Sequence, residues 1–197
     1  MHSNHATLAD QVVPGHSSLA RNAILAVTGS LLLWVSAKLQ VPFYPVPVTM
    51  QTFVVLMIGT AYGWRLGAAT VALYLLQGAL GMPVFAGTPE KGIGLAYMMG
   101  PTGGYLAGYL VAACLTGALA GLGWDRRPST TILSMVAGNV VIYAFGLAWL
   151  GTVVGWDKPV LAWGLTPFLL GDLLKIALAA AILPTTWKLI AGRSSSR

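Results

Sequence analysis

Long apolar segments alternate with short polar ones along most of the chain. The apolar segments cover about residues 19–39, 48–64, 66–80, 104–123, 131–150 and 167–189. A helix needs about 20 apolar residues to cross the hydrocarbon core of a bilayer, and the second and third segments are short for that length. The pattern predicts an all-α membrane protein with six transmembrane helices, and a tight turn at residues 62–65 between the second and third.

The polar segments at the two ends predict tails outside this helical domain. We expect a polar N-terminal tail (residues 1–18), a six-helix domain (19–190) and a basic C-terminal tail (191–197). The first tail is expected to be mobile or to lie at the surface. Its histidines, His2, His5 and His16, lack the spacing and partners of a metal site, so no metal is expected. Val35-Ser36-Ala37 resembles a signal-peptidase site, but the apolar stretch is long for a signal core, and we expect the helix to be retained.

The composition points to lipid as the main solvent of the chain. Hydrophobic residues make up 56% of it and charged residues only 8%, against about 25% charged in soluble domains. A soluble protein of this composition would expose large apolar patches. The sequence GxxxxGK[ST] of ATP-binding loops does not occur, so any energy that the protein uses would have to come from elsewhere. The net charge of +6 comes from scattered basic residues, which does not favour nucleic-acid binding.

The basic residues of the loops predict the orientation in the membrane. With the N-terminus inside, the cytoplasmic side carries Arg21, Arg65, Arg126, Arg127, Lys188, Arg193 and Arg197, and the outer side Lys38, Lys91 and Lys158. Both termini are therefore expected in the cytoplasm. The outer loop QVPFYPVP at residues 40–47 contains three prolines, which stop a helix and stiffen the backbone.

Polar side chains within the predicted spans concentrate in the outer half. With a rise of about 1.5 Å per residue, Asp172 lies roughly 8 Å and Lys175 roughly 12 Å below the outer end of the last helix. These two residues are three positions apart, so they share a helix face and can neutralise each other. Because polar groups in lipid need a partner or a cavity, we expect a pocket that opens outward. Other polar members of this half are Gln51, Tyr74, Gln77, Thr102, Tyr105, Asn139 and Tyr143.

Three classes of function remain open at this point. The first is a transport subunit that binds a small molecule without catalysis. The second is an intramembrane enzyme that uses Asp172 as general acid or base, although the spans contain no second carboxylate or histidine to cooperate with it. The third is a structural subunit whose pocket is filled by side chains. The ion pair itself could serve packing alone, but two desolvated charges are a poor source of stability.

Four segments of the chain form a set that occurs together in one family. They are VPVTMQTF at 46–53, YLLQGALGMPVFAG at 74–87, GPTGGYLAGY at 100–109, and PF at 167–168 followed by GDLLK at 171–175. With these segments the chain resembles the BioY family, the biotin-specific S components of energy-coupling factor (ECF) transporters. The resemblance implies the six-helix S-component fold, with both termini cytoplasmic, in a bacterial plasma membrane. It implies capture of biotin from outside and uptake driven by a transmembrane coupling protein with two cytoplasmic ATPases. No cofactor or catalytic residue is expected, and self-association is left open.

This resemblance suggests roles for the polar and aromatic residues. Asp172 would accept hydrogen bonds from the ureido N–H groups of biotin, and Gln51 or Asn139 would contact the ureido carbonyl. Lys175, or the amides of Gly103 and Gly104, would bind the carboxylate. The rings would be covered by Tyr74, Phe85, Tyr97, Tyr105 and Tyr143, with Thr102 at the outer start of a helix and Pro42, Tyr44, Pro45 and Pro47 in a lid. Ala26 and Ser30 stand where many S components carry AxxxA for docking on the coupling protein.

Overall fold

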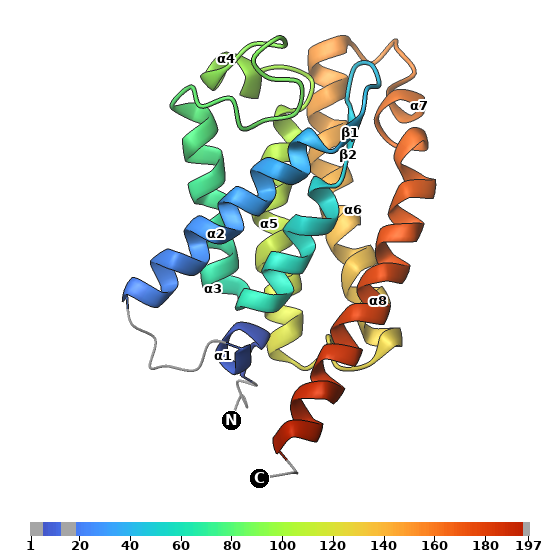
Figure 1. The fold of residues 1–197 in the computed structure, drawn as a ribbon. Helices are drawn as coiled ribbons and strands as arrows, with labels where there is room; N and C mark the ends of the chain where they lie inside the picture. Colours follow the sequence, from blue (N-terminus) through green and yellow to red (C-terminus); the bar gives the residue numbers. More distant parts are fainter. Residues whose placement is uncertain (1–5, 13–18, 195–197) are drawn as a thin grey trace.

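The computed structural model describes residues 6–12 and 19–194, which are mostly helical (Figure 1). The elements in chain order are α1 (Leu8–Val12), α2 (Leu19–Lys38), β1 (Gln40–Val41), β2 (Val48–Thr49), α3 (Gln51–Ala79), α4 (Gly94–Met98), α5 (Gly103–Gly121), α6 (Pro128–Val154), α7 (Val160–Gly164) and α8 (Thr166–Ser194). Within these described residues, five helical segments are long and apolar enough to cross a membrane. They are α2, α3, α5, α6 and the stretch that ends in α8.

Helix α3 folds back on itself at Gly63. This glycine has φ 78° and ψ 168°, a backbone conformation that side chains disfavour. Beyond it the chain returns beside itself, because Gln51 Nε2 donates to Tyr74 OH at 2.6 Å although 23 residues separate the two. In a straight helix they would lie about 35 Å apart. The two halves, residues 51–62 and 64–79, lie where the second and third spans were predicted, with the turn between them.

The end of the bundle away from the termini carries short elements that the apolar pattern did not predict (Figure 1). Strands β1 and β2 pair antiparallel, with Gln40 opposite Thr49. The proline-rich loop is therefore the turn of a β-hairpin, and the expected all-α class is corrected to a mostly helical one. Helices α4 and α7 lie at this same end. These elements cap the bundle above the starts of α3, α5 and α8.

Part of the N-terminal tail packs against the bundle. Helix α1 buries Leu8, which is 6% exposed, near the turn of α3. Thr7 starts this helix by donating through its backbone N–H and its hydroxyl to Asp10 Oδ2, at 3.1 and 2.8 Å. An ion pair of 3.0 Å between Asp10 and Arg21 ties α1 to α2. Residues 8–12 of the expected tail thus form a helix on the surface of the bundle, with residues 10–12 exposed, while the three histidines lie outside the described residues.

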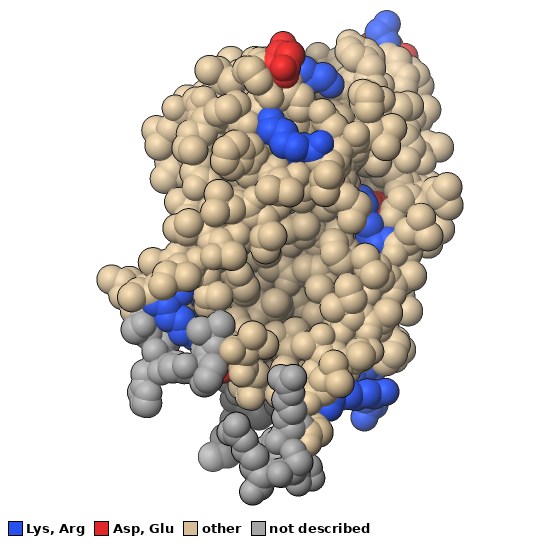
Figure 2. Space-filling view, viewed as in Figure 1, with Lys and Arg blue, Asp and Glu red and all other residues tan. Residues whose placement is uncertain are grey.

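Charged side chains gather near the two ends of the molecule. On the face drawn in Figure 2, a broad belt between the ends is almost uncharged, apart from one small basic patch. The long helices expose many large apolar side chains, such as Leu31 on α2, Val140 on α6 and Leu173 on α8. Lipid is the solvent that tolerates such a surface. The described residues form a multi-pass membrane protein.

Candidate functional site

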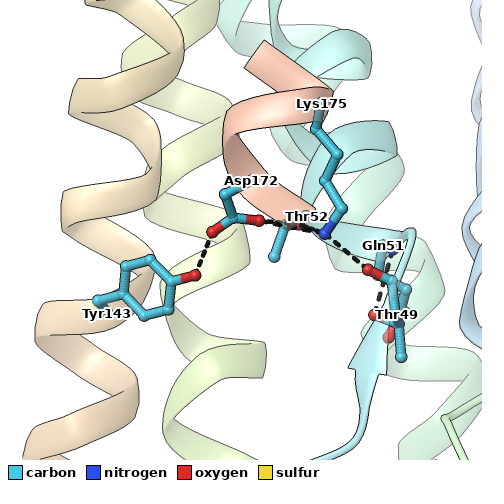
Figure 3. Close-up of polar contacts among 6 residues, drawn as sticks. All are labelled: Thr49, Gln51, Thr52, Tyr143, Asp172 and Lys175. Atoms are coloured by element: carbon cyan, nitrogen blue, oxygen red, sulfur yellow. Dashed lines mark hydrogen bonds and ion pairs between the residues drawn. The ribbon is translucent and has the colours of Figure 1, made fainter. Parts of the chain in front are cut away.

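Asp172 and Lys175 form a buried ion pair on α8 (Figure 3). Lys175 Nζ lies 3.1 Å from Asp172 Oδ1, and the two side chains are 9% and 6% exposed. The ammonium group also donates to Thr49 O and Thr52 Oγ1, both at 2.8 Å, at the start of α3. The phenol of Tyr143 on α6 donates to Asp172 Oδ2. The charges are thus satisfied within the bundle by hydrogen bonds from α3 and α6, as buried charges require.

A narrow pocket of about 20 Å³ lies beside this pair, beneath the capping elements. Its walls come from the hairpin, the loop around α4 and the outer ends of four long helices. The lining residues are Val46, Pro47, Thr49, Gln51, Thr52, Ala86, Tyr97, Thr102, Tyr105, Leu106, Tyr109, Tyr143 and Phe168. A cavity of this size holds about one water molecule, so its walls must move apart to admit a larger ligand. Aromatic walls with a few amide and hydroxyl groups suit a small organic molecule that carries polar groups at its edges.

Three aromatic rings build one wall of the pocket. Tyr105 stacks on Phe168 with ring centroids 6.3 Å apart, and Tyr143 meets Phe168 at 6.2 Å and 64°. The Tyr105 hydroxyl donates to Gly164 O at 2.7 Å, which fastens the end of α7 to the start of α5. This wall therefore joins α5, α6 and α8 into one surface.

The opposite wall is supported by aromatic residues behind its lining. Phe85 stacks on Tyr97, with centroids 5.0 Å apart, and meets Tyr74 edge-on at 5.5 Å. Tyr97 donates to Ala86 O at 2.7 Å, and burial raises the pKa of this phenol, so it stays a protonated donor. The Tyr74 hydroxyl accepts a hydrogen bond from the Gln51 amide. Tyr74 and Phe85 thus position the lining and do not form it.

The loop that contains Phe85 and Thr88 is also fastened to the end of α2. Lys38 Nζ donates to the carbonyl oxygens of Phe85 and Thr88 at 3.0 and 2.8 Å, and to the Thr88 hydroxyl at 3.0 Å. The sequence placed Lys38 only as a basic residue at the outer side. In the structure it holds the loop that carries one wall of the pocket.

The structure brings part of the predicted site together. Gln51, Tyr97, Thr102, Tyr105 and Tyr143 line the pocket, as does Pro47 of the predicted lid. Asp172 and Lys175 do not line it; they lie behind Thr52 and Tyr143, to which they are hydrogen-bonded. In the rest of the predicted lid, Pro42 and Tyr44 are exposed in the hairpin turn and Pro45 is buried.

Gly103 and Gly104 correct the prediction that their amides face a ligand. Both lie in an apolar groove between α4, α5 and α6, away from the pocket. The Gly103 N–H donates to Gly100 O at 3.0 Å. A Cβ atom at Gly104 would come within 2.4 Å of Phe145 O. These glycines allow α5 to approach α6 closely.

Asn139 lies below the ion pair, outside the main pocket. It borders a separate cavity of only about 10 Å³ together with Thr52 and Lys175. Asn139 is 7% exposed, and its Oδ1 atom has no hydrogen-bond partner among the described residues. A buried amide oxygen without a donor is costly, so this position calls for an explanation.

Ser30 is fully buried between α2 and α3, which corrects the predicted docking pair. Its hydroxyl donates to Val27 O at 2.9 Å and accepts from Gln77 Nε2 at 3.3 Å. Ser30 therefore stabilises packing inside the chain and offers no surface to another protein. Ala26, one turn earlier, is half-buried.

Several lining residues were missed by the sequence analysis. Tyr109 follows Tyr105 by four positions, so the two share a helix face, and this spacing was an available signal. Thr49, Thr52 and Phe168 lie within the segments singled out for their resemblance. The side chain of Thr49 gave no signal for its contact with Lys175, because a backbone carbonyl makes that contact.

Comparisons with known proteins agree on one family. The model described as "BioY family" matches residues 5–192. A protein of Pyrococcus horikoshii named "Probable biotin transporter BioY" is 37% identical over 163 residues, which are 83% of this chain and 94% of that protein. The "Biotin transporter BioY" of Thermotoga maritima is 38% identical over 164 residues, covering 82% and 93%.

A solved structure shares the fold. It is the S-component for biotin from an ECF-type ABC transporter, with a TM-score of 0.71 and 22% sequence identity. The match covers 89% of this chain and 95% of that one. The fold is therefore that of the S components.

Proposed function

This chain belongs to the BioY family, and on that premise we propose that it binds biotin as the S component of an ECF transporter. The observation that carries the proposal is the pocket next to the buried Asp172–Lys175 pair. The relatives named above carry names of biotin transporters, which favours transport over an enzyme or a structural subunit.

The polar groups at the inner end of this pocket match those of the ureido ring of biotin. The ring offers N–H donors for Asp172 and a carbonyl acceptor for the Gln51 amide. The Lys175 ammonium is not available to the carbonyl, because its three N–H donors already have acceptors within the chain. The valerate carboxylate fits the mouth better, because a second negative charge beside Asp172 would disfavour binding. The hydroxyl group of Thr102 is a donor on the way out, whereas the phenols of Tyr97 and Tyr105 already donate to backbone carbonyls. The aromatic rings of Tyr105 and Phe168 cover the apolar thiophane ring.

The distribution of charge and the fold together support one orientation of the bundle in the membrane. We propose that the bundle crosses the membrane six times, with the two halves of α3 counted separately and both termini in the cytoplasm. The end that holds the termini carries the larger number of basic residues, as the positive-inside rule requires. The pocket then opens to the outside, and the hairpin is the lid over it.

Uptake requires partners that provide energy. We propose a transmembrane coupling protein and two cytoplasmic ATPases, because the chain has no phosphate-binding loop of its own. The exposed face of α2 around Ala26 supports docking by small-residue contact, without Ser30. The cell location is the bacterial plasma membrane.

Ligand analogues test both the substrate and its pose. Purified protein in detergent is titrated with biotin, with desthiobiotin, with lipoic acid, which has the valerate but no ureido ring, and with biocytin, in which the carboxylate is an amide. Biotin, with about 16 heavy atoms at about 0.7 kcal/mol each, should reach nanomolar affinity. Biocytin and desthiobiotin should compete, and lipoic acid should not. Failure of biotin to bind would refute the function, and exclusion of biocytin alone would refute the pose.

A further inference from the structure

The phenol of Tyr143 stands between the pocket and Asp172 (Figure 3). Tyr143 lines the pocket, whereas Asp172 is 4% exposed and does not. Asp172 Oδ1 accepts from Lys175 at 3.1 Å and from Thr52 at 3.5 Å, and Oδ2 accepts from Tyr143. Each carboxylate oxygen therefore has a donor from within the chain. A carboxylate oxygen can accept two hydrogen bonds, and a ligand donor in the pocket that binds Oδ2 competes with the phenol for this oxygen.

Tyr143 is placed so that it can give way. It is half-buried, and it meets Tyr105 and Phe168 edge-on, at 89° and 64°, without being clamped between stacked rings. Long side chains on a helix lean toward its N-terminus. On α6 that direction leads to Asn139, one turn earlier on the same face, whose Oδ1 atom has no donor among the described residues. The chain thus holds a second acceptor for the same phenol.

We propose that Tyr143 is a gate residue that occupies the place of a ligand donor on Asp172. When N–H donors of a ligand bind Asp172, the phenol moves to Asn139 Oδ1. The inference rests on the proposed function, because the ureido N–H groups of biotin are the displacing donors. The phenol exchanges a hydrogen bond to a charged acceptor for a weaker one to a neutral acceptor. The gate therefore lowers affinity, and it favours ligands with strong, paired N–H donors over ligands with a single hydroxyl group.

Removal of the phenol hydroxyl tests the gate. Tyr143→Phe is compared with Tyr105→Phe, a pocket-lining tyrosine whose hydroxyl bonds the Gly164 carbonyl instead. We expect Tyr143→Phe to bind biotin about tenfold tighter than the parent. The melting temperature of Tyr143→Phe without biotin should be lower than that of the parent. The increase in melting temperature on adding biotin should be larger for Tyr143→Phe than for the parent. Tyr105→Phe should not tighten binding.

The role of Asn139 is tested in both backgrounds. Asn139→Leu should weaken biotin binding in the parent, because the displaced phenol loses its acceptor, and should have little effect when combined with Tyr143→Phe. Equal weakening in both backgrounds overturns the movement to Asn139. Unchanged or weaker binding by folded Tyr143→Phe overturns the gate, while the parent still binds biotin. A parent that does not bind biotin overturns the proposed function and the gate together.

Discussion

Replacement of Asp172 by asparagine removes the negative charge of the buried pair and keeps its shape. In the parent, three donors reach the carboxylate, and the Lys175 ammonium is 9% exposed. The asparagine variant leaves this ammonium with two neutral acceptors, Thr49 O and Thr52 Oγ1. It also removes the charged acceptor proposed for the ureido N–H groups. Hydrogen bonds to charged groups are worth about 1.5 to 3 kcal/mol, and an unpaired buried charge costs more.

We therefore expect Asp172→Asn to lose about 2 to 4 kcal/mol of biotin binding. This corresponds to an affinity about 30-fold to 700-fold weaker. The assay is equilibrium binding of labelled biotin to purified protein in detergent, with a melting curve to show that the variant is folded.

The matched control is Asp157→Asn. Asp157 pairs with Lys158 at the same 3.1 Å, but the two side chains are 73% and 51% exposed. Exposed pairs contribute about 0 to 1 kcal/mol, and this one lies outside the pocket, so the control should bind biotin like the parent. A folded Asp172→Asn protein with parental affinity would show that the pair serves packing alone.

Three further substitutions probe the wall, the helix contacts and the docking face. Thr52→Val deprives the buried ammonium of an acceptor and should lower the free energy of unfolding by about 1 to 3 kcal/mol, together with biotin affinity; Thr186→Val, on an exposed face of α8, should change neither. Gly104→Ala should lower the melting temperature, at a cost of about 1 to 3 kcal/mol, because its Cβ meets α6. Gly121→Ala, with nothing within 4 Å, should not, and equal melting curves would refute the close contact. Ala26→Leu should reduce co-purification with the coupling protein and leave biotin binding intact; unchanged co-purification would move the docking face elsewhere.

The long helices could be predicted from sequence because lipid demands continuous apolar segments. The predicted segments at 104–123 and 131–150 correspond to α5 and α6 within a few residues. The ion pair was also predictable, since a spacing of three on one helix and the cost of isolated charges both bring Asp172 and Lys175 together.

The sequence did not predict which face of each helix packs against its neighbours and which face lies in lipid. In lipid, the outer surface of a helix is as apolar as the side that packs against its neighbours, so periodicity does not distinguish the two. Ser30 and Gly104 show the consequence: their small size suits a docking face or a ligand contact equally well, and only the tertiary contacts show that both serve packing inside the chain. The hairpin was missed because its two strands of two residues are too short to leave an alternating pattern.

The hydrogen bonds around Lys175 have a consequence for how cargo leaves the carrier. Because one ammonium group links α8 to the start of α3, and its carboxylate partner accepts from α6, separating these helices would leave an uncompensated charge in the bilayer. A passage opened down the middle of the bundle is therefore disfavoured. Motion of the whole chain as a rigid body leaves every one of these bonds intact.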